Sequence, residues 1–89
     1  MKKDSRKKER NEMIKVLFFA RLQDEAGTEA LEAQKAGQTV QEIKAWLKEE
    51  YQLSSLDQAM AAVNEEFADN EDTLSDGDTI AFIPPVSGG

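Results

Sequence analysis

The stretch MIKVLFFA, residues 13–20, decides how this chain folds. It is short, rich in β-branched and aromatic side chains, and followed by the polar stretch RLQDEAGT, a pattern that predicts a β-strand. Successive side chains of a strand point to opposite faces. One face is formed by Ile14, Val16 and Phe18. The other is formed by Lys15, Leu17 and Phe19. Because both faces are partly apolar, we expect a central strand with one side covered by the core and an adhesive other side.

Working outward, the sequence predicts three further strands. ALEAQKA (residues 30–36) alternates weakly and is interpreted as an edge strand in a hairpin with the first. AMAAVNEEF (residues 59–67) is interpreted as a short strand that ends in a polar turn. Residues 68–78 are interpreted as a loop, in which the Asp-Gly pair marks a turn. TIAFI (residues 79–83) is the last strand, and it ends at Pro84 because proline cannot donate a hydrogen bond to the sheet.

Between the second and third strands, GQTVQEIKAWLKEEY (residues 37–51) predicts a helix. Thr39 and Glu42 have the spacing of a capping box, in which each side chain satisfies a free backbone N–H group. An apolar stripe follows at spacings of three and four residues. It consists of Val40, Ile43, Leu47 and Tyr51. Trp46 flanks the stripe, and we expect it to cover the edge of the core rather than to stack on a ligand.

The predicted order is strand, strand, helix, strand, strand. One helix covers only one face of a sheet, so the fold class is α+β, a two-layer domain with a mixed sheet. If the first and last strands are parallel neighbours in the middle of the sheet, the fold is a β-grasp, or ubiquitin-like, fold. We expect a charged, disordered leader at residues 1–12, the domain at 13–83 and an extended tail at 84–89.

The composition excludes several classes of function. The 89 residues suffice for one domain, and they include no cysteine or histidine. A disulfide framework, a thiolate nucleophile, a Cys/His zinc site and a histidine base are therefore excluded. The acidic loop at 68–78 does not match the twelve-residue calcium-binding pattern, so we predict no metal site.

Charge and hydropathy restrict the partners. Residues 1–12 hold six Lys/Arg and three Asp/Glu, a balance of +3, which leaves five and fifteen, a balance of −10, for residues 13–89. So acidic a domain repels nucleic acid. No apolar run approaches the roughly 20 residues that span a bilayer, and the start lacks the apolar segment of a secretory signal. We therefore expect a cytoplasmic protein that binds neither nucleic acid nor membrane.

The chain closes with IPPVSGG, residues 83–89, which predicts a projecting arm. Pro84 and Pro85 keep the chain extended, and the glycines lack a Cβ, so the end fits a narrow cleft. The arm is completed by Val86, Ser87 and Gly88, with a carboxylate at Gly89. Once activated as a mixed anhydride, for instance with AMP, this carboxylate can accept sulfur or form an amide with a lysine.

Three stretches together resemble the small subunit of molybdopterin synthase, the MoaD-type sulfur-carrier family. They are MIKVLFFARLQDEAGTEA, AAVNEEF and LSDGDTIAFIPPVSGG. The resemblance covers residues 13–89, and the typical carrier lacks the first twelve residues. It implies a β-grasp fold and a thiocarboxylate at Gly89.

The same resemblance implies a set of partners. The chain itself would be non-catalytic and hold no permanent cofactor, with ATP consumed as an AMP adduct on Gly89. Adenylylation would come from an E1-like, MoeB-type enzyme, and sulfur from a donor such as a cysteine desulfurase or rhodanese. The active site would lie in a MoaE-type large subunit, in a heterotetramer of two large and two small subunits.

The adhesive sheet face is the expected docking surface for the large subunit. If the first and last strands pair, the alternation places Leu17 and Phe19 beside Ala81 and Ile83, with Phe67 as a further contributor. An apolar patch of this kind on a small domain marks a partner surface.

Three alternatives remain beside the molybdopterin carrier. A thiamine-pathway sulfur carrier shares the fold and the terminal diglycine. A ubiquitin-like modifier would use the same end to form an isopeptide with lysine. A self-contained enzyme is the weakest alternative, because the chain has no histidine, cysteine or compact carboxylate pair.

Overall fold

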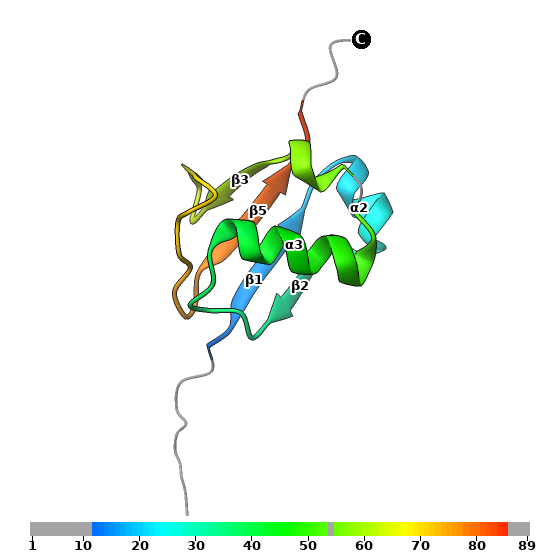
Figure 1. Cartoon of the computed structure of the whole chain (residues 1–89). Coiled ribbons are helices and arrows are strands. Elements are labelled where there is room, and N and C mark those ends of the chain that lie inside the picture. The colour runs from blue at the N-terminus through cyan, green and yellow to red at the C-terminus, as the bar shows by residue number, and fades with distance from the viewer. Residues whose placement is uncertain (1–11, 54, 86–89) are drawn as a thin grey trace, which may run out of the picture.

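A five-stranded sheet with one long helix across it forms the domain (Figure 1). The computed structural model describes residues 12–53 and 55–85. The strands are β1 (Ile14–Phe18), β2 (Ala30–Ala33), β3 (Met60–Val63), β4 (Glu66–Ala68) and β5 (Thr79–Ile83). The helices are α2 (Arg21–Ala26), α3 (Val40–Tyr51) and the single 3₁₀ turn η1 (Leu56–Gln58). The predicted leader, apart from Glu12, and the tail from residue 86 onward lie outside the described residues.

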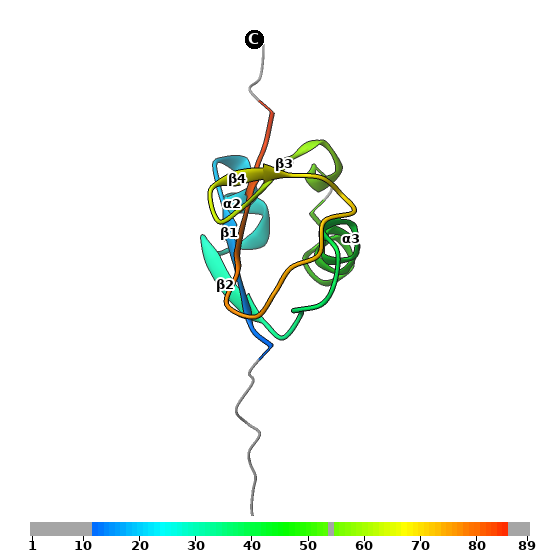
Figure 2. The ribbon, with the colours of Figure 1, turned by 90° about the vertical axis from the view of Figure 1, so that its left-hand side faces the viewer.

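The strand order is β2-β1-β5-β3-β4. β1 and β5 pair in parallel, with Leu17 opposite Ala81, and the other neighbouring pairs are antiparallel. Figure 2 shows the sheet and α3 as two separate layers. The prediction of an α+β, ubiquitin-like β-grasp fold, with the first and last strands side by side, is confirmed.

The capping box that starts α3 is present as predicted. The Thr39 N–H donates to Glu42 Oε1 at 2.9 Å, and the Glu42 N–H donates to Thr39 Oγ1 at 3.2 Å. The stripe packs onto the sheet with Val40, Ile43 and Leu47 buried. Trp46 is half-buried at the edge of the core, as expected, with its ring edge-to-face to Tyr51 at 6.2 Å between centroids.

Core side chains fill the space between the sheet and α3. The central strands contribute alternate residues, since Val16, Phe18, Ile80 and Phe82 have at most 1% of their surface exposed. Leucines from the connecting segments close the remaining sides. They are Leu22, Leu53, Leu56 and Leu74. The helix side of β1 and β5 is thus the core side, and the opposite sheet face is left open.

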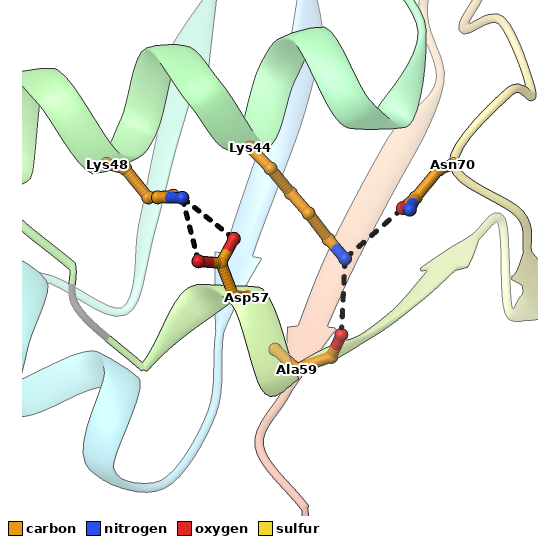
Figure 3. Close-up of polar contacts among 5 residues, drawn as sticks. All are labelled: Lys44, Lys48, Asp57, Ala59 and Asn70. Atoms are coloured by element: carbon orange, nitrogen blue, oxygen red, sulfur yellow. Dashed lines mark hydrogen bonds and ion pairs between the residues drawn. The ribbon is translucent and has the colours of Figure 1, made fainter.

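Along one flank, α3 is tied to η1 and to the loop after β4 (Figure 3). Lys48 Nζ pairs with the Asp57 carboxylate at 2.8 Å. Lys44 Nζ donates to Asn70 Oδ1 at 3.3 Å and lies 3.5 Å from the Ala59 carbonyl oxygen. These contacts fix the layer that covers the core and leave the open sheet face untouched.

The acidic loop uses its carboxylates as turn acceptors. Asp78 Oδ2 accepts the Ser75 N–H at 2.8 Å, and Asp76 Oδ1 accepts the Met13 N–H at 3.0 Å. Gly77 has a φ of 89°, the left-handed turn that the Asp-Gly pair predicts. Within residues 12–53 and 55–85 there is no group of three potential metal ligands, and no helix there is long and apolar enough to cross a membrane.

Several predicted boundaries were wrong. The strand predicted for residues 13–20 is β1 alone, and the one predicted for 30–36 ends at Ala33. The polar stretch after β1 contains α2, whose N-cap residue Ala20 offers no capping side chain and so gives no start signal. The stretch 59–67 holds most of two strands rather than one strand and a turn, because Asn64 and Glu65 reverse the chain between β3 and β4.

Candidate functional site: the open sheet face and the chain exit

The sheet face away from α3 carries a hollow of about 600 Å³. It is lined by Leu17, Phe19, Ala62, Asn64, Glu65, Phe67, Thr79, Ala81 and Ile83. This open-face hollow includes all five residues predicted for the docking surface, whereas Lys15, predicted for the same face of the first strand, is not among its lining residues. Their role in binding a partner stays a prediction.

Strand register explains why these residues meet. Leu17, Ala81 and Ala62 form a row across β1, β5 and β3, because each lies opposite the next in the paired strands. They alternate with the core residues Val16, Ile80 and Ala61, which point the other way. The small side chains of Ala62 and Ala81 form the bottom of the hollow, and larger side chains surround it.

Two phenylalanines form the walls of the hollow. Phe19 follows β1 and has 43% of its surface exposed, whereas Phe67 on the edge strand β4 has 72% exposed. Aromatic side chains are seldom left this open without a reason, and clustered apolar groups of this kind mark partner surfaces. Met60, with 46% exposed, is the other large apolar side chain that is exposed among the described residues.

The chain leaves the sheet beside the hollow. Ile83 lines the hollow and is the last residue of β5, Pro84 is half-buried and Pro85 is exposed. In Figure 1 this exit lies at the end of the sheet where β5 points. Gly89 is the sixth residue after Ile83, and six residues span at most about 20 Å. Residues 86–89, which carry the predicted chemistry, lie outside the described residues.

A polar rim closes the hollow at the β3–β4 turn. The Asn64 N–H donates to the Thr79 carbonyl oxygen at 2.8 Å, and Asn64 Oδ1 accepts the Thr79 N–H at 3.0 Å. Asn64 Nδ2 also donates to Asp78 Oδ1 at 3.0 Å. These three bonds fix the tip of the turn to the start of β5, with Glu65 on the rim.

Sequence reasoning missed four contributors to this site, which are Ala62, Asn64, Glu65 and Thr79. Thr79 could have been found from the same alternation along the last strand that gave Ala81 and Ile83. Ala62 could have been found from alternation along β3, had the pairing of β3 with β5 been known. Asn64 and Glu65 were assigned to a turn without a position, because the turn lacks the Asn-Gly pair that marks a two-residue hairpin. The described residues thus present an apolar hollow next to the point where the chain leaves the sheet.

Comparison with known proteins places the chain among its relatives. A family model described as the ThiS family matches residues 16–89. The chain belongs to the ThiS family. It is also 38% identical over 81 residues to the molybdopterin synthase sulfur carrier subunit of Escherichia coli (strain K12), an alignment that covers 86% of this chain and 100% of that protein.

Solved structures share the fold of this ThiS-family chain. One is a chain from the protein–protein complex of subunits 1 and 2 of molybdopterin-converting factor from Helicobacter pylori 26695, with 34% identity and a TM-score of 0.64 over 86% of this chain and 99% of that one. Another is the small archaeal modifier protein 1 from Methanosarcina acetivorans, with 26% identity and a TM-score of 0.73 over 86% and 96%. The resemblance to molybdopterin carriers is confirmed by these relatives.

Proposed function

We propose that this chain is the sulfur carrier subunit of molybdopterin synthase. The observation that carries the proposal is that the open-face hollow lies beside the exit of the chain toward Gly89. Docking through the hollow would direct the tail into a cleft of the bound partner. The 38% identity to a carrier subunit over that protein's full length supports the same function.

The chemistry takes place at the Gly89 carboxylate. A carboxylate oxygen attacks the α-phosphorus of ATP in an E1-like, MoeB-type enzyme, so pyrophosphate leaves and an acyl-adenylate forms. Sulfide attacks the carbonyl carbon and expels AMP. A donor such as a cysteine desulfurase or rhodanese holds this sulfur as a persulfide, and a thiol reductant converts it to the sulfide level as it is transferred. The resulting thiocarboxylate gives its sulfur to a pterin precursor, and water restores the carboxylate. Two such deliveries build a dithiolene.

The described part of the chain acts by binding and positioning. It supplies the docking surface, and Pro84 and Pro85 restrict the backbone φ where the chain leaves the sheet. The reaction on the pterin belongs to a MoaE-type large subunit, in an assembly of two large and two small subunits in the cytoplasm. The subunit complex of the Helicobacter pylori protein supports a partner of this kind.

A role as a ubiquitin-like modifier is the second candidate, because the chain is similar to the small archaeal modifier protein 1. In that role an amine of a lysine, rather than sulfide, would attack the activated carbonyl carbon. A thiamine-pathway carrier would also form a thiocarboxylate, and it fits the family as a whole.

Intact mass of the protein purified from its own host tests the proposal. Exchange of one carboxylate oxygen for sulfur adds about 16 Da, as expected when sulfide attacks an activated acyl group. A modifier would instead appear joined to lysines of other proteins. Conversion of a pterin precursor to molybdopterin by the thiocarboxylated chain and the large subunit then separates the two sulfur-carrier pathways. Failure of that conversion would contradict the proposed function.

A further inference from the structure

Glu65 occupies an unusual position at the rim of the open-face hollow. It is the second residue of the two-residue turn between β3 and β4, where Val63 pairs with Glu66. Its side chain is exposed and lines the hollow. Of the described residues that line the hollow, Glu65 alone is charged.

The backbone at this position favours glycine. Asn64 has a φ of 52° and Glu65 a φ of 72°, so both residues of the turn are in the left-handed region. Asparagine tolerates this conformation, but a long side chain pays a steric cost there that glycine avoids. Residues that break this local rule cluster at functional sites, but they also occur elsewhere, as Ala20 and Gln52 of this chain show. The turn itself gives no reason for a carboxylate at this position.

The backbone of the turn that carries Glu65 is anchored to the start of β5. Its neighbour Asn64 is held to Thr79 and Asp78 by the three hydrogen bonds of the polar rim. The ion pair found between described residues joins Lys48 to Asp57 in the α3 layer, away from the hollow. Within residues 12–53 and 55–85 the Glu65 carboxylate is thus not paired with a cation, and it lies at the rim of an apolar surface.

We propose that Glu65 is a docking contact that forms an ion pair with a Lys or Arg side chain on the surface that covers the hollow. This inference rests on the proposed function, in which that surface belongs to the large subunit. The balance of −10 over residues 13–89 already favours a basic partner, because complementary charges speed encounter. The ion pair of Glu65 would add to this overall attraction a contact at one defined position, next to the apolar part of the interface.

The test uses matched variants of the full chain and the large subunit from the same host. Glu65→Gln removes the charge and keeps the size, and Glu65→Gly removes the charge and the backbone strain. Glu66→Gln is the control, because Glu66 is adjacent, exposed and on the opposite face of β4, and its loss changes the net charge equally. Affinity and association rate are measured at several salt concentrations, beside thermal melting.

We expect both Glu65 variants to lose about two- to fivefold in affinity at low salt, the range of an exposed ion pair. The loss should disappear near 1 M salt, where the screening length is about 3 Å. Glu65→Gly should also melt a few degrees higher than the parent, so stability and affinity change in opposite directions. Glu66→Gln should lose less than Glu65→Gln at every salt concentration.

Two outcomes would overturn the inference, and only the second would also contradict the proposed function. If Phe67→Ala abolishes binding while Glu65→Gln binds as tightly as the parent, or no more weakly than Glu66→Gln, the hollow is the interface but Glu65 makes no specific ion pair. If Phe67→Ala also binds like the parent, the hollow is not the interface, and the docking step of the proposed function fails with the inference.

Discussion

Replacing Phe67 with alanine should weaken binding to the large subunit strongly while costing the domain little stability. Phe67 is 72% exposed, and an aromatic side chain offers about 200 Å² of surface, so about 145 Å² is free for a partner to cover. At about 25 cal/mol per Å², covering that surface contributes about 3.6 kcal/mol. Alanine retains a small part of it, so the loss is about 3 kcal/mol, or about a hundredfold in Kd.

The cost to folding follows from the remaining 28% of the same surface. About 55 Å² is covered within the domain, which gives at most about 1.4 kcal/mol, because burial relative to an extended chain is an upper bound. Melting should therefore fall by less than about 10 °C for a domain of this size. Isothermal titration calorimetry with the large subunit, beside thermal melting, measures both quantities.

Lys48→Ala is the matched control, because Lys48 is exposed in the α3 layer on the other side of the sheet. It should leave the affinity within about twofold. If Phe67→Ala binds within threefold of the parent, the hollow is not the docking surface. If it unfolds the domain, the side chain contributes to stability in a way that its exposure does not show. Either result refutes the reasoning.

Three further predictions concern the other parts of the molecule. Phe19→Asp should weaken binding to the large subunit while the domain stays folded, whereas an unfolded variant in circular dichroism would place Phe19 in the core. Gln52→Gly should raise the melting temperature by about 3 °C. Gln52 ends α3 with a left-handed φ of 56°, and glycine relieves that strain by more than it stabilises the unfolded chain through added conformational entropy. An unchanged or lower melting temperature would contradict this. Deleting Gly89, or adding one residue after it, should leave melting and partner binding unchanged but abolish dithiolene formation in a synthase assay, because the reactive carbon moves by about 3.5 Å and errors near an ångström cost about a hundredfold. Full activity of the extended chain, with the added residue still attached, would contradict the sulfur-carrier proposal.

The elements with dense local signals could be predicted from the sequence. β5 was predicted with its correct bounds because β-branched and aromatic residues run up to Pro84. α3 was predicted because its capping box and its apolar stripe both point to the same helix. The parallel pairing of β1 with β5 came from the family resemblance, since periodicity carries no information on strand order.

The features that were not predicted depend on backbone conformations for which the sequence carries no recognisable signal. Ala20 adopts a φ of 54° and a ψ of −132° to turn the chain from β1 into α2, although alanine disfavours this region. Asn64 and Glu65 form a hairpin turn without glycine, so β4 was not separated from β3. Because the floor of the hollow depends on the register of β3 with β5, Ala62 could not be assigned from sequence alone.

The parallel pairing of β1 with β5 has a mechanical consequence. Parallel neighbours place the entry of the chain at Met13 and its exit at Pro85 at opposite ends of the sheet. Tension between a held tail and the N-terminal side would slide the two strands along each other, so the hydrogen bonds between them would share the load instead of opening one by one. The domain should therefore resist mechanical unfolding while a partner holds its C-terminal tail. A protein attached at the N-terminal side would sit far from the tail and leave it free to work.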